Sequence, residues 1–416
     1  MSWTSVVIRK LARSEEMFAQ SRTFVGVTAS LTGALDADAM AVAFDTLLQT
    51  HPVLAAHFER GPDDLHQLVA DDFEHPGIWV VEKGIEEAAP RLNQGVALAN
   101  LGLTLGEGRA AVTLYTHHSL ADAQHQFSLL AELFSFYTDV VTTGSTGPVN
   151  AEPAPEPLEV LLEQRGIAKQ QRSGLERLLR AMYAYELPPS PRRNAGGNPA
   201  VPTRVPVARC QLTEGETLEL ATFCRDHRVS IHAVVSAAIL LAEWQFRNTP
   251  QVPIPFLYPV DLRLLLTPPV EATGSTNPLG LGAYLAEIGT NTELLELARD
   301  IVDTFREDLS DRITQQSLLH FDLQYEGSPP GLPDPVMATD GGTVPSLRTP
   351  PNVIVTSLQS ELFTASAAGV DLYAFSVYSG QLQIEHHAHT PAPDGTIAAI
   401  HSMLCSTASD DDWLSE

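Results

Sequence analysis

The order of expected strands and helices repeats in the two halves of the chain, and this repetition constrains the fold most. A strand-like run at 23–33 leads into a helix capped by Asp36, whose apolar residues follow i, i+3, i+4, i+7 spacing. In the second half, a strand run at 205–212 leads into a helix at 214–228, and an almost wholly apolar helix follows at 230–246. Strands that alternate with helices in this way predict an α/β fold with large mixed sheets.

Two stretches rich in Pro, Gly, Ser and Ala divide the chain, at 143–157 and at 188–204. A chain of 416 residues exceeds the size at which one hydrophobic core usually stops growing. We therefore expect an N-terminal domain over 1–187, which includes the linker 143–157, and a C-terminal domain over 205–416. Residues 188–204 would form the crossing between the two domains.

Composition excludes several classes of function. The net charge of −26, from 25 Lys and Arg against 51 Asp and Glu, argues against a nucleic-acid partner. No apolar run is long enough for a transmembrane segment, and the N-terminus lacks the apolar core of a signal peptide, so we expect a cytoplasmic protein. The cysteines Cys210, Cys224 and Cys405 have no metal-type spacing, and buried reduced thiols are the favoured interpretation.

A basic island contrasts with this acidic background. It extends over 165–193 and lies mostly in a helical segment expected at about 158–186. Two interpretations are open, a solvated helix face and a docking surface for an acidic partner. The cations of the island are Arg165, Lys169, Arg172, Arg177, Arg180, Arg192 and Arg193.

Near the C-terminus, residues 371–389 alternate in polarity around Ser379 and Gly380, which predicts a β-hairpin. His387 and His389 share one face of the second strand. A metal site on that face is conceivable, but a pair of histidines that is exposed to solvent or packed in the sheet is favoured.

Three histidines and one aspartate fall within "TLYTHHSLADAQHQF", residues 113–127. Strand alternation places His117 and His118 on opposite faces, and His125 lies on the following helix, so a metal site is not expected. A histidine at the end of a strand can project into a cleft and accept a proton near pH 7. Asp122 is placed to cap the helix. From these residues alone, an acid–base centre and a purely structural junction both stay open.

The hexapeptide "HHSLAD" at 117–122 resembles the His-His-x-x-x-Asp-Gly signature of the thioester-dependent acyltransferase superfamily. That superfamily contains chloramphenicol acetyltransferase, the condensation domains of nonribosomal peptide synthetases and polyketide-associated acyltransferases. Three further stretches resemble it in order and spacing, at 43–58, 258–263 and 276–284, so the resemblance covers nearly the whole chain. It is strongest to the polyketide-associated branch. The resemblance implies two chloramphenicol-acetyltransferase-like domains with an active-site tunnel between them.

The resemblance also implies roles for particular residues. The second histidine of the signature, here His118, would be the general base, and His117 would point away and support the loop. Asp122 would form an ion pair with an arginine, which by position is Arg306, with Arg312 as the alternative. Ala123 replaces the glycine of the signature, from which we infer ordinary helical backbone at that position.

The implied reaction is transfer of a long-chain, polyketide-derived and methyl-branched acyl group to the hydroxyls of a lipid diol, which forms wax diesters. The donor would be a thioester of coenzyme A or of an acyl carrier protein, with no covalent acyl-enzyme and no cofactor. Oxyanion donors are sought among Ser, Thr and Asn near 276–277 and 356–357. The carrier protein would dock through Arg172, Arg177 and Arg180. The alternatives are a noncatalytic condensation-like scaffold and an amide-forming condensation domain.

Overall fold

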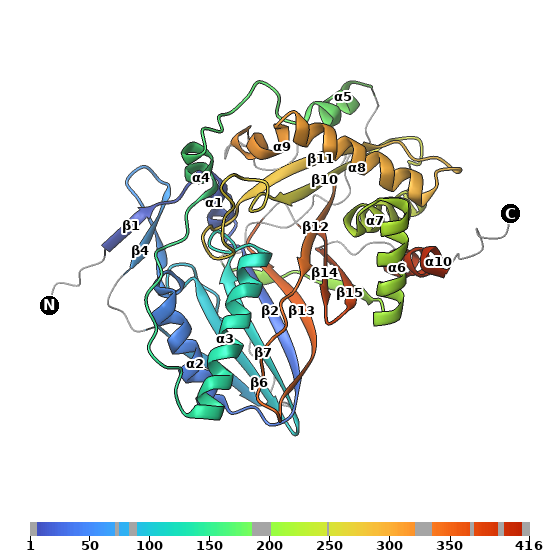
Figure 1. Cartoon of the computed structure of the whole chain (residues 1–416). Coiled ribbons are helices and arrows are strands. Elements are labelled where there is room, and N and C mark those ends of the chain that lie inside the picture. Colours follow the sequence, from blue (N-terminus) through green and yellow to red (C-terminus); the bar gives the residue numbers. More distant parts are fainter. Residues whose placement is uncertain are drawn as a thin grey trace.

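The computed structural model shows two domains built around two six-stranded sheets, stacked one above the other in the view of Figure 1. The structure describes residues 6–70, 75–82, 90–184, 201–247, 249–320, 335–366, 370–389 and 395–409. The mixed α/β architecture predicted from the sequence is confirmed.

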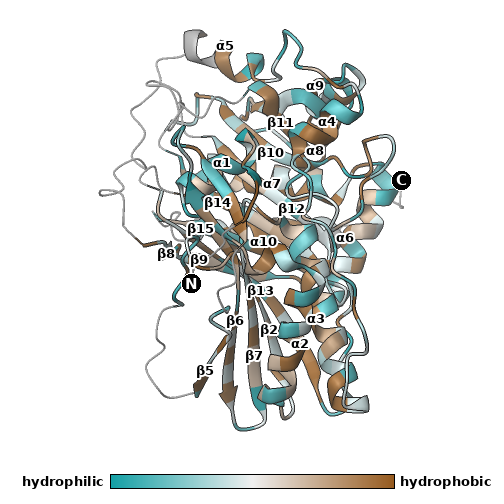
Figure 2. Ribbon diagram, turned by 90° about the vertical axis from the view of Figure 1, so that its left-hand side faces the viewer, coloured by the Kyte–Doolittle hydropathy of each residue, from teal (hydrophilic) through white to brown (hydrophobic). Residues whose placement is uncertain are grey.

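The first sheet has the strand order β5-β6-β7-β2-β13-β8, and all neighbouring pairs are antiparallel except β5 with β6. Helices α2 (Ala37–Thr50) and α3 (Ala123–Thr143) cover one face, as Figure 2 shows from the side. Their apolar stripes and the strands form one continuous core. The strands are β5 (Ile78–Glu82), β6 (Ala99–Gly106), β7 (Arg109–His117), β2 (Phe24–Thr32), β13 (Ile354–Thr364) and β8 (Thr203–Arg204).

The second sheet has the order β11-β10-β12-β14-β15-β9 and is mixed, because β10, β12 and β14 run parallel. Helix α7 is apolar nearly all round, and it is buried between the sheet and its neighbouring helices. The strands are β11 (Leu279–Ala286), β10 (Ile254–Asp261), β12 (Val336–Thr343), β14 (Asp371–Tyr378), β15 (Gln381–Ala388) and β9 (Val207–Gln211). The helices are α6 (Glu214–His227), α7 (Ile231–Phe246), α8 (Leu294–Ser310) and α10 (Thr396–Ser409).

Smaller elements join the two domains. A three-stranded sheet of β1 (Val6–Lys10), β4 (His66–Ala70) and β3 (His57–Arg60) lies beside the first domain. Helix α1 (Arg13–Gln20) follows β1 and lies near α4 (Leu158–Gln164) in Figure 1. The remaining elements are η1 (Pro52–Ala55), α5 (Glu176–Ala184), α9 (Ile313–Gln316) and η3 (Ser317–His320).

Local signals in the sequence are confirmed where hydrogen bonds or backbone angles test them. Asp36 accepts a hydrogen bond from the backbone N–H of Ala39 at 2.9 Å, and so caps α2. The turn between β14 and β15 lies at Ser379 and Gly380, both with positive φ, as a tight hairpin turn requires.

The helical segment expected over 158–186 is wrong as a single helix. The structure has α4 and α5 with non-helical residues between them, and Gly166 and Gly174 there have φ of 66° and 86°. Glycine adopts these left-handed angles without a steric penalty, so the chain turns between the two helices.

The predicted domain boundaries also need one correction. Residues 205–416 do not all belong to the second domain, because β13 pairs with β2 over nine register positions in the first sheet. In Figure 1 the orange β13 lies directly beside the blue β2. The two domains are therefore interlocked by a strand that the C-terminal half contributes to the N-terminal sheet.

Among the described residues, no single helix is both long and apolar enough to cross a membrane. The pair α6 and α7 passes a test of combined length and composition, but the two helices meet at an angle of 104°.

Candidate functional site

His118 directly follows β7, at the point where the strand gives way to the loop that leads into α3. Three contacts fix it. Its backbone N–H donates to Thr23 O at 2.8 Å, its carbonyl accepts from Asn277 Nδ2 at 2.6 Å, and its ring packs against Phe18 with centroids 4.3 Å apart. The side chain is partly exposed, whereas its neighbour His117 is fully buried. The backbone of His118 is thus held by both halves of the chain.

The hydrogen bond of the ring defines the reactive nitrogen. Nδ1 of His118 lies 3.0 Å from the carbonyl oxygen of Ala121, and because a carbonyl only accepts, Nδ1 must carry the proton. Nε2 of the neutral ring then has a free lone pair. Burial lowers the pKa of His118 below its usual value, although the Ala121 carbonyl and the Asp122 carboxylate oppose this shift. The ring is therefore neutral at pH 7 and can accept a proton through Nε2.

Asp122 caps α3 and forms a buried ion pair with Arg263. Its Oδ1 accepts from the backbone N–H of His125 at 3.0 Å, and its two carboxylate oxygens accept from the guanidinium of Arg263 at 2.7 and 2.8 Å. Arg263 also contacts Asp261 and the carbonyl of Ala272. Burial opposes the charge of Arg263, but the Asp122 carboxylate outweighs it and raises the pKa of Arg263.

The predicted partners of Asp122 are therefore wrong. Arg306 lies on the exposed side of α8, 63% exposed, and pairs with Asp303 on the same helix. Arg312 precedes α9 with a φ of 58° and is also exposed. Helix α8 packs against α7 in the second domain, and Figure 1 shows it well above α3. The partner is instead Arg263, the last residue of "YPVDLR" at 258–263, which lies directly beside the loop that contains Asp122. The resemblance of this stretch to the superfamily was the signal in the sequence that could have identified Arg263.

His117 belongs to a chain of buried hydrogen bonds that leads to α1. Its Nδ1 accepts from the N–H of Ser119 at 3.2 Å, so Nε2 carries the proton and donates to Gln94 Oε1 at 2.9 Å. Gln94 Nε2 lies 3.4 Å from His66 Nε2, and His66 Nδ1 lies 2.7 Å from the carboxylate of Glu16. Each group in this series of hydrogen bonds donates to the next one. Because the Glu16 carboxylate at its end only accepts, it fixes the tautomers of both imidazole rings.

Helix α1 also contacts the loop directly. The hydroxyl of Ser119 donates to the carbonyl of Glu15 at 2.7 Å, and Phe18 lies against the His118 ring. Arg9 forms a bidentate ion pair with the buried Glu15 carboxylate. The roles of Glu16, Gln94 and His66 could not be inferred from the sequence, because they lie on three separate segments with no shared motif.

The third histidine of the motif, His125, is on α3. Its Nδ1 lies 3.0 Å from the carbonyl of Ser275, and burial lowers its pKa to about 4. The helix begins at Ala123, so the backbone there is ordinary helix, as inferred for the residue that replaces the signature glycine. The three imidazoles thus have separate partners.

Residues 275–277 run beside the loop and contain two unsatisfied polar groups. The carbonyl of Thr276 accepts from the N–H of Asp122 at 3.2 Å. The hydroxyl of Thr276 and the side-chain oxygen of Asn277 are buried and have no hydrogen-bond partner within the described part of the chain. The other predicted oxyanion segment differs, since Thr356 is exposed and bonds to Ser30 O on the neighbouring strand.

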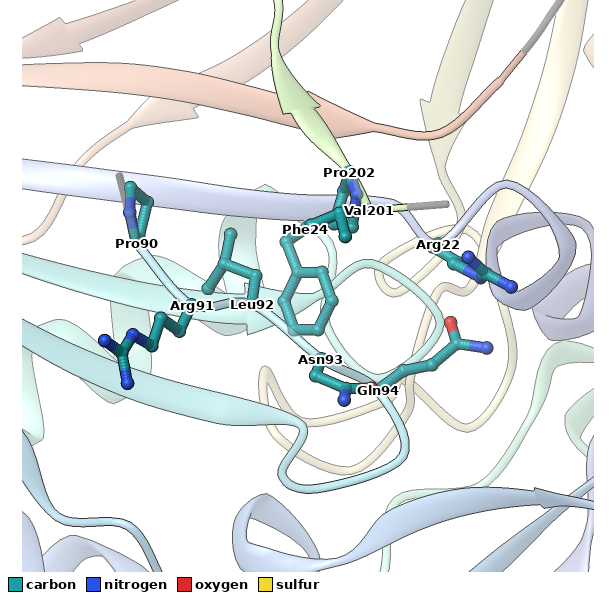
Figure 3. Close-up of a pocket in the computed structure, with 9 residues that line it drawn as sticks. All are labelled: Arg22, Phe24, Pro90, Arg91, Leu92, Asn93, Gln94, Val201 and Pro202. Carbon is teal, nitrogen blue, oxygen red and sulfur yellow. The ribbon is translucent and has the colours of Figure 1, made fainter. Parts of the chain in front are cut away.

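A pocket of about 430 Å³ lies on the His117 side of the loop. Figure 3 shows Phe24 and Leu92 in its apolar wall, with the guanidinium groups of Arg22 and Arg91 at opposite ends and Gln94 along its edge. Phe24 and Gln94 both contact His117, whereas His118 does not line the pocket.

Two cations of the basic island already form ion pairs with carboxylates in α8 or directly after it. Arg177 binds the buried carboxylate of Asp308 at 2.8 Å, and Arg172 binds Asp311 at 2.9 Å. Arg180 is exposed, and Arg192 and Arg193 lie outside the described residues. Arg177 thus attaches α5 to the second domain, which the sequence did not predict.

Comparisons with known proteins match one family, over the second half of the chain in one case and over nearly its whole length in the others. The family model described as the phthiocerol/phthiodiolone dimycocerosyl transferase C-terminus matches residues 201–387. The chain is 49% identical to the phthiocerol/phthiodiolone dimycocerosyl transferases of Mycobacterium tuberculosis (strain ATCC 25618 / H37Rv) and Mycobacterium leprae (strain TN), covering 99% of either protein and 99% of itself.

Solved structures show the same relationship. The structure of polyketide synthase associated protein 5 from Mycobacterium tuberculosis matches with a TM-score of 0.89 at 49% identity, over 98% of this chain and 99% of that one. Trichothecene 15-O-acetyltransferase from Fusarium sporotrichioides matches with a TM-score of 0.71 over 97% of each chain. The first condensation domain of the calcium-dependent antibiotic synthetase matches with 0.66 over 98% of each. The last two, both at 13% identity, show the fold alone.

Proposed function

The chain belongs to the phthiocerol/phthiodiolone dimycocerosyl transferase family, and on that basis we propose that His118 is the general base of its acyl transfer. The resemblance to the polyketide-associated branch is confirmed. It extends to these mycobacterial enzymes in particular, which the stretches at 5–20, 242–255 and 381–389 resemble. The protein is an O-acyltransferase that moves a long-chain acyl group from a thioester to the hydroxyls of a lipid diol such as phthiocerol and forms wax diesters.

The observation that carries the proposal is the unprotonated Nε2 of His118 on a partly exposed ring. Nε2 takes the proton of the diol hydroxyl as its oxygen attacks the thioester carbonyl. The tetrahedral intermediate then collapses, the C–S bond breaks, and the imidazolium returns the proton to the departing thiolate. General base catalysis of this kind contributes about 10²- to 10⁴-fold to the rate. Ser119 is not needed as a nucleophile, since its hydroxyl donates to Glu15 O.

We place the oxyanion donor in the 275–277 segment. Asn277 Nδ2 is already committed to the carbonyl of His118, whereas the hydroxyl of Thr276 has no partner among the described residues. A buried donor without a ground-state partner is suited to a charge that develops only in the transition state. Thr276 is therefore the preferred donor.

The substrates would reach His118 through a tunnel between the two domains. The Asp122–Arg263 ion pair and the Asn277–His118 hydrogen bond both cross from one half of the chain to the other beside the base. This geometry supports a site at the domain interface, where the two substrates enter from opposite sides. Thioester donors of this kind are cytoplasmic, and we assign the enzyme to that compartment.

Exchange of His118 for Ala tests the proposal. Acyl transfer from a long-chain thioester to a fatty alcohol should fall by about 10²-fold or more, with the circular dichroism spectrum unchanged. Ser119→Ala separates the base from a serine nucleophile. It should lose much less of the rate than His118→Ala, because it removes only the hydrogen bond to the Glu15 carbonyl and no acyl-enzyme forms. A near-normal rate in His118→Ala would show that another group is the base.

The same assay addresses the two alternatives. No turnover in the wild-type protein with any thioester would favour a noncatalytic scaffold. Faster transfer to an amine than to an alcohol of equal length would favour an amide-forming condensation enzyme.

We further propose that an acyl carrier protein domain docks on the exposed cations of the basic island. Arg172, Arg177 and Arg180 were predicted as the contacts, but Arg177 is only 27% exposed and is paired with buried Asp308. The docking test should therefore reverse Arg172 and Arg180 to Glu and leave Arg177 intact. The Michaelis constant should rise for a carrier-bound donor and not for a coenzyme A donor. Equal effects on both donors would contradict docking at this surface.

A further inference from the structure

A cluster of three potential metal ligands lies in the second domain, outside the site described above. Its members are Glu216 on α6 and His401 and Cys405 on α10, and their ligand atoms all lie within 4.8 Å of one another. His401 and Cys405 are four residues apart, so they share one face of α10. Figure 1 shows α6 and α10 side by side at the outer edge of the second domain.

The distances from the Cys405 sulfur are close to those within a tetrahedral zinc site. The sulfur of Cys405 lies 3.4 Å from Glu216 Oε1, and 3.7 and 3.8 Å from the two ring nitrogens of His401. With Zn–S of about 2.3 Å and Zn–N or Zn–O of about 2.0 Å at tetrahedral angles, ligand atoms are separated by about 3.5 Å. The sulfur therefore already stands at the required spacing from both partners.

The Glu216 carboxylate is fixed in the orientation that a ligand needs. Its Oε2 accepts from the backbone N–H of Thr213 at 2.7 Å and from the Thr213 hydroxyl at 2.8 Å, which is the capping box of α6. Oε1 is thereby directed toward Cys405. Hydrogen bonds that orient a ligand from behind are typical of metal sites in proteins.

Access and neighbouring groups also fit. All three side chains are partly exposed, so an ion can enter from solvent without opening the core. Strand β9 packs against α10 and carries a further thiol, that of Cys210.

We propose that Glu216, His401 and Cys405 bind one zinc-class divalent ion that ties α10 to α6. Thiolate and imidazole ligands favour zinc over magnesium or calcium, which prefer all-oxygen sites. On binding, the Cys405 thiol releases its proton to solvent and the thiolate coordinates the ion. One carboxylate and one thiolate neutralise the two positive charges. The role is structural, because α6 and α10 lie at the outer edge of the second domain, away from the His118 loop.

Cobalt titration of the full-length, tag-free protein, freed of metal by a chelator, tests this site. Added Co²⁺ alone should produce a thiolate-to-cobalt charge-transfer band in the near ultraviolet that saturates at one ion per chain, and Zn²⁺ should abolish it. Cys405→Ser should lose the band, and His401→Ala should bind Co²⁺ at least about tenfold more weakly. Cys224→Ala is the matched control, since that buried thiol is not in the cluster, and should keep the band.

Thermal unfolding gives a second readout. Zn²⁺ should raise the Tm of the wild-type protein and leave that of Cys405→Ser and His401→Ala unchanged, because binding to the folded state alone stabilises it. Absence of the cobalt band, or an equal band in Cys405→Ser, would overturn the site. Acyl transfer by the metal-free protein should stay normal, so failure of the metal site and failure of His118 as the base are distinguishable.

Discussion

Arg263 is the residue on which the position of the His118 loop depends most. It is buried, and its guanidinium binds both oxygens of Asp122. Removal of one partner from a buried ion pair leaves the other charge without compensation, at a cost of about 3–5 kcal/mol. We expect Arg263→Ala to lower the free energy of unfolding in urea by about this amount and to reduce transfer activity as well.

Arg306→Ala is the control for that substitution. The Arg306 side chain is exposed, and within the described part of the chain its ion pair is with Asp303 on the same helix, so its removal should change stability by less than about 0.5 kcal/mol. Comparable losses in the two variants would contradict the assignment of Arg263 as the partner of Asp122.

Individual residues were predictable from the sequence where the interaction is local. The caps Asp36 and Asp122 each bond to an N–H three residues away, and that spacing is visible in the sequence. The partner of Asp122 is 141 residues away, and several arginines satisfy the same chemistry. Only the folded chain selects among them, and it selects Arg263 because the loop after β10 reaches the start of α3.

At the scale of elements, α1 supports the catalytic loop. Its Phe18 packs against the His118 ring, and its Glu15 carbonyl accepts from Ser119. Its Glu16 carboxylate ends the series of hydrogen bonds that runs from His117 through Gln94 and His66. A helix that contributes no reacting group thus determines the orientation of the residue next to the base. Such support matters because small displacements of a catalytic group reduce the rate strongly.

Glu16→Gln tests the contribution of α1. The amide is uncharged and offers only one acceptor oxygen, whereas the Glu16 carboxylate accepts from both the N–H and the ring of His66. We expect kcat to fall by about tenfold while KM changes little, because the loop loses its alignment and the substrate contacts stay. Met17→Ala, on the same helix but 42% exposed, should leave kcat unchanged. A change in KM alone would argue against a role for Glu16 in positioning the loop.

Elements with local signals were predicted and elements with distant partners were not. The β14–β15 hairpin follows from alternation around two turn residues. The pairing of β13 with β2 joins residues more than 300 positions apart, and nothing in either strand specifies its partner. The break between α4 and α5 was only partly predictable. Gly166 and Gly174 can be read in the sequence, but the sequence does not show that they adopt positive φ angles.

At the scale of the whole molecule, the two domains are joined by more than the linker. Strand β13 enters the first sheet, and a buried cluster then connects it to the second. Glu385 on β15 accepts from Arg209 Nε at 2.7 Å and from both the N–H and the hydroxyl of Ser360 on β13. The Ser360 hydroxyl also lies 3.1 Å from His387 Nε2, so this histidine is buried between the two sheets, which is the packed one of the two non-metal alternatives left open by the sequence.

We expect this cluster to make the stability of the folded protein depend on pH. Burial opposes the charge of Glu385, but His387, Arg209 and Ser360 outweigh it and lower the pKa of Glu385 to about 2, from 4.5 in the unfolded chain. A depressed folded-state pKa contributes stability that is fully present above pH 4.5 and is lost as pH falls toward 2. The shift corresponds to about 3 kcal/mol.

Glu385→Gln should remove this contribution. At pH 7 the variant should unfold at lower urea than the wild type, since partly buried Arg209 and buried His387 then lie beside a neutral amide. The difference should shrink as the pH is lowered from 4.5 toward 2, because the wild-type carboxyl gradually becomes neutral as well. Gln383→Ala is a control, because its amide bonds to the same carboxylate but carries no charge, so its effect should not vary with pH. A stability difference between Glu385→Gln and wild type that stays constant over this range would show that the charge of Glu385 does not join the domains.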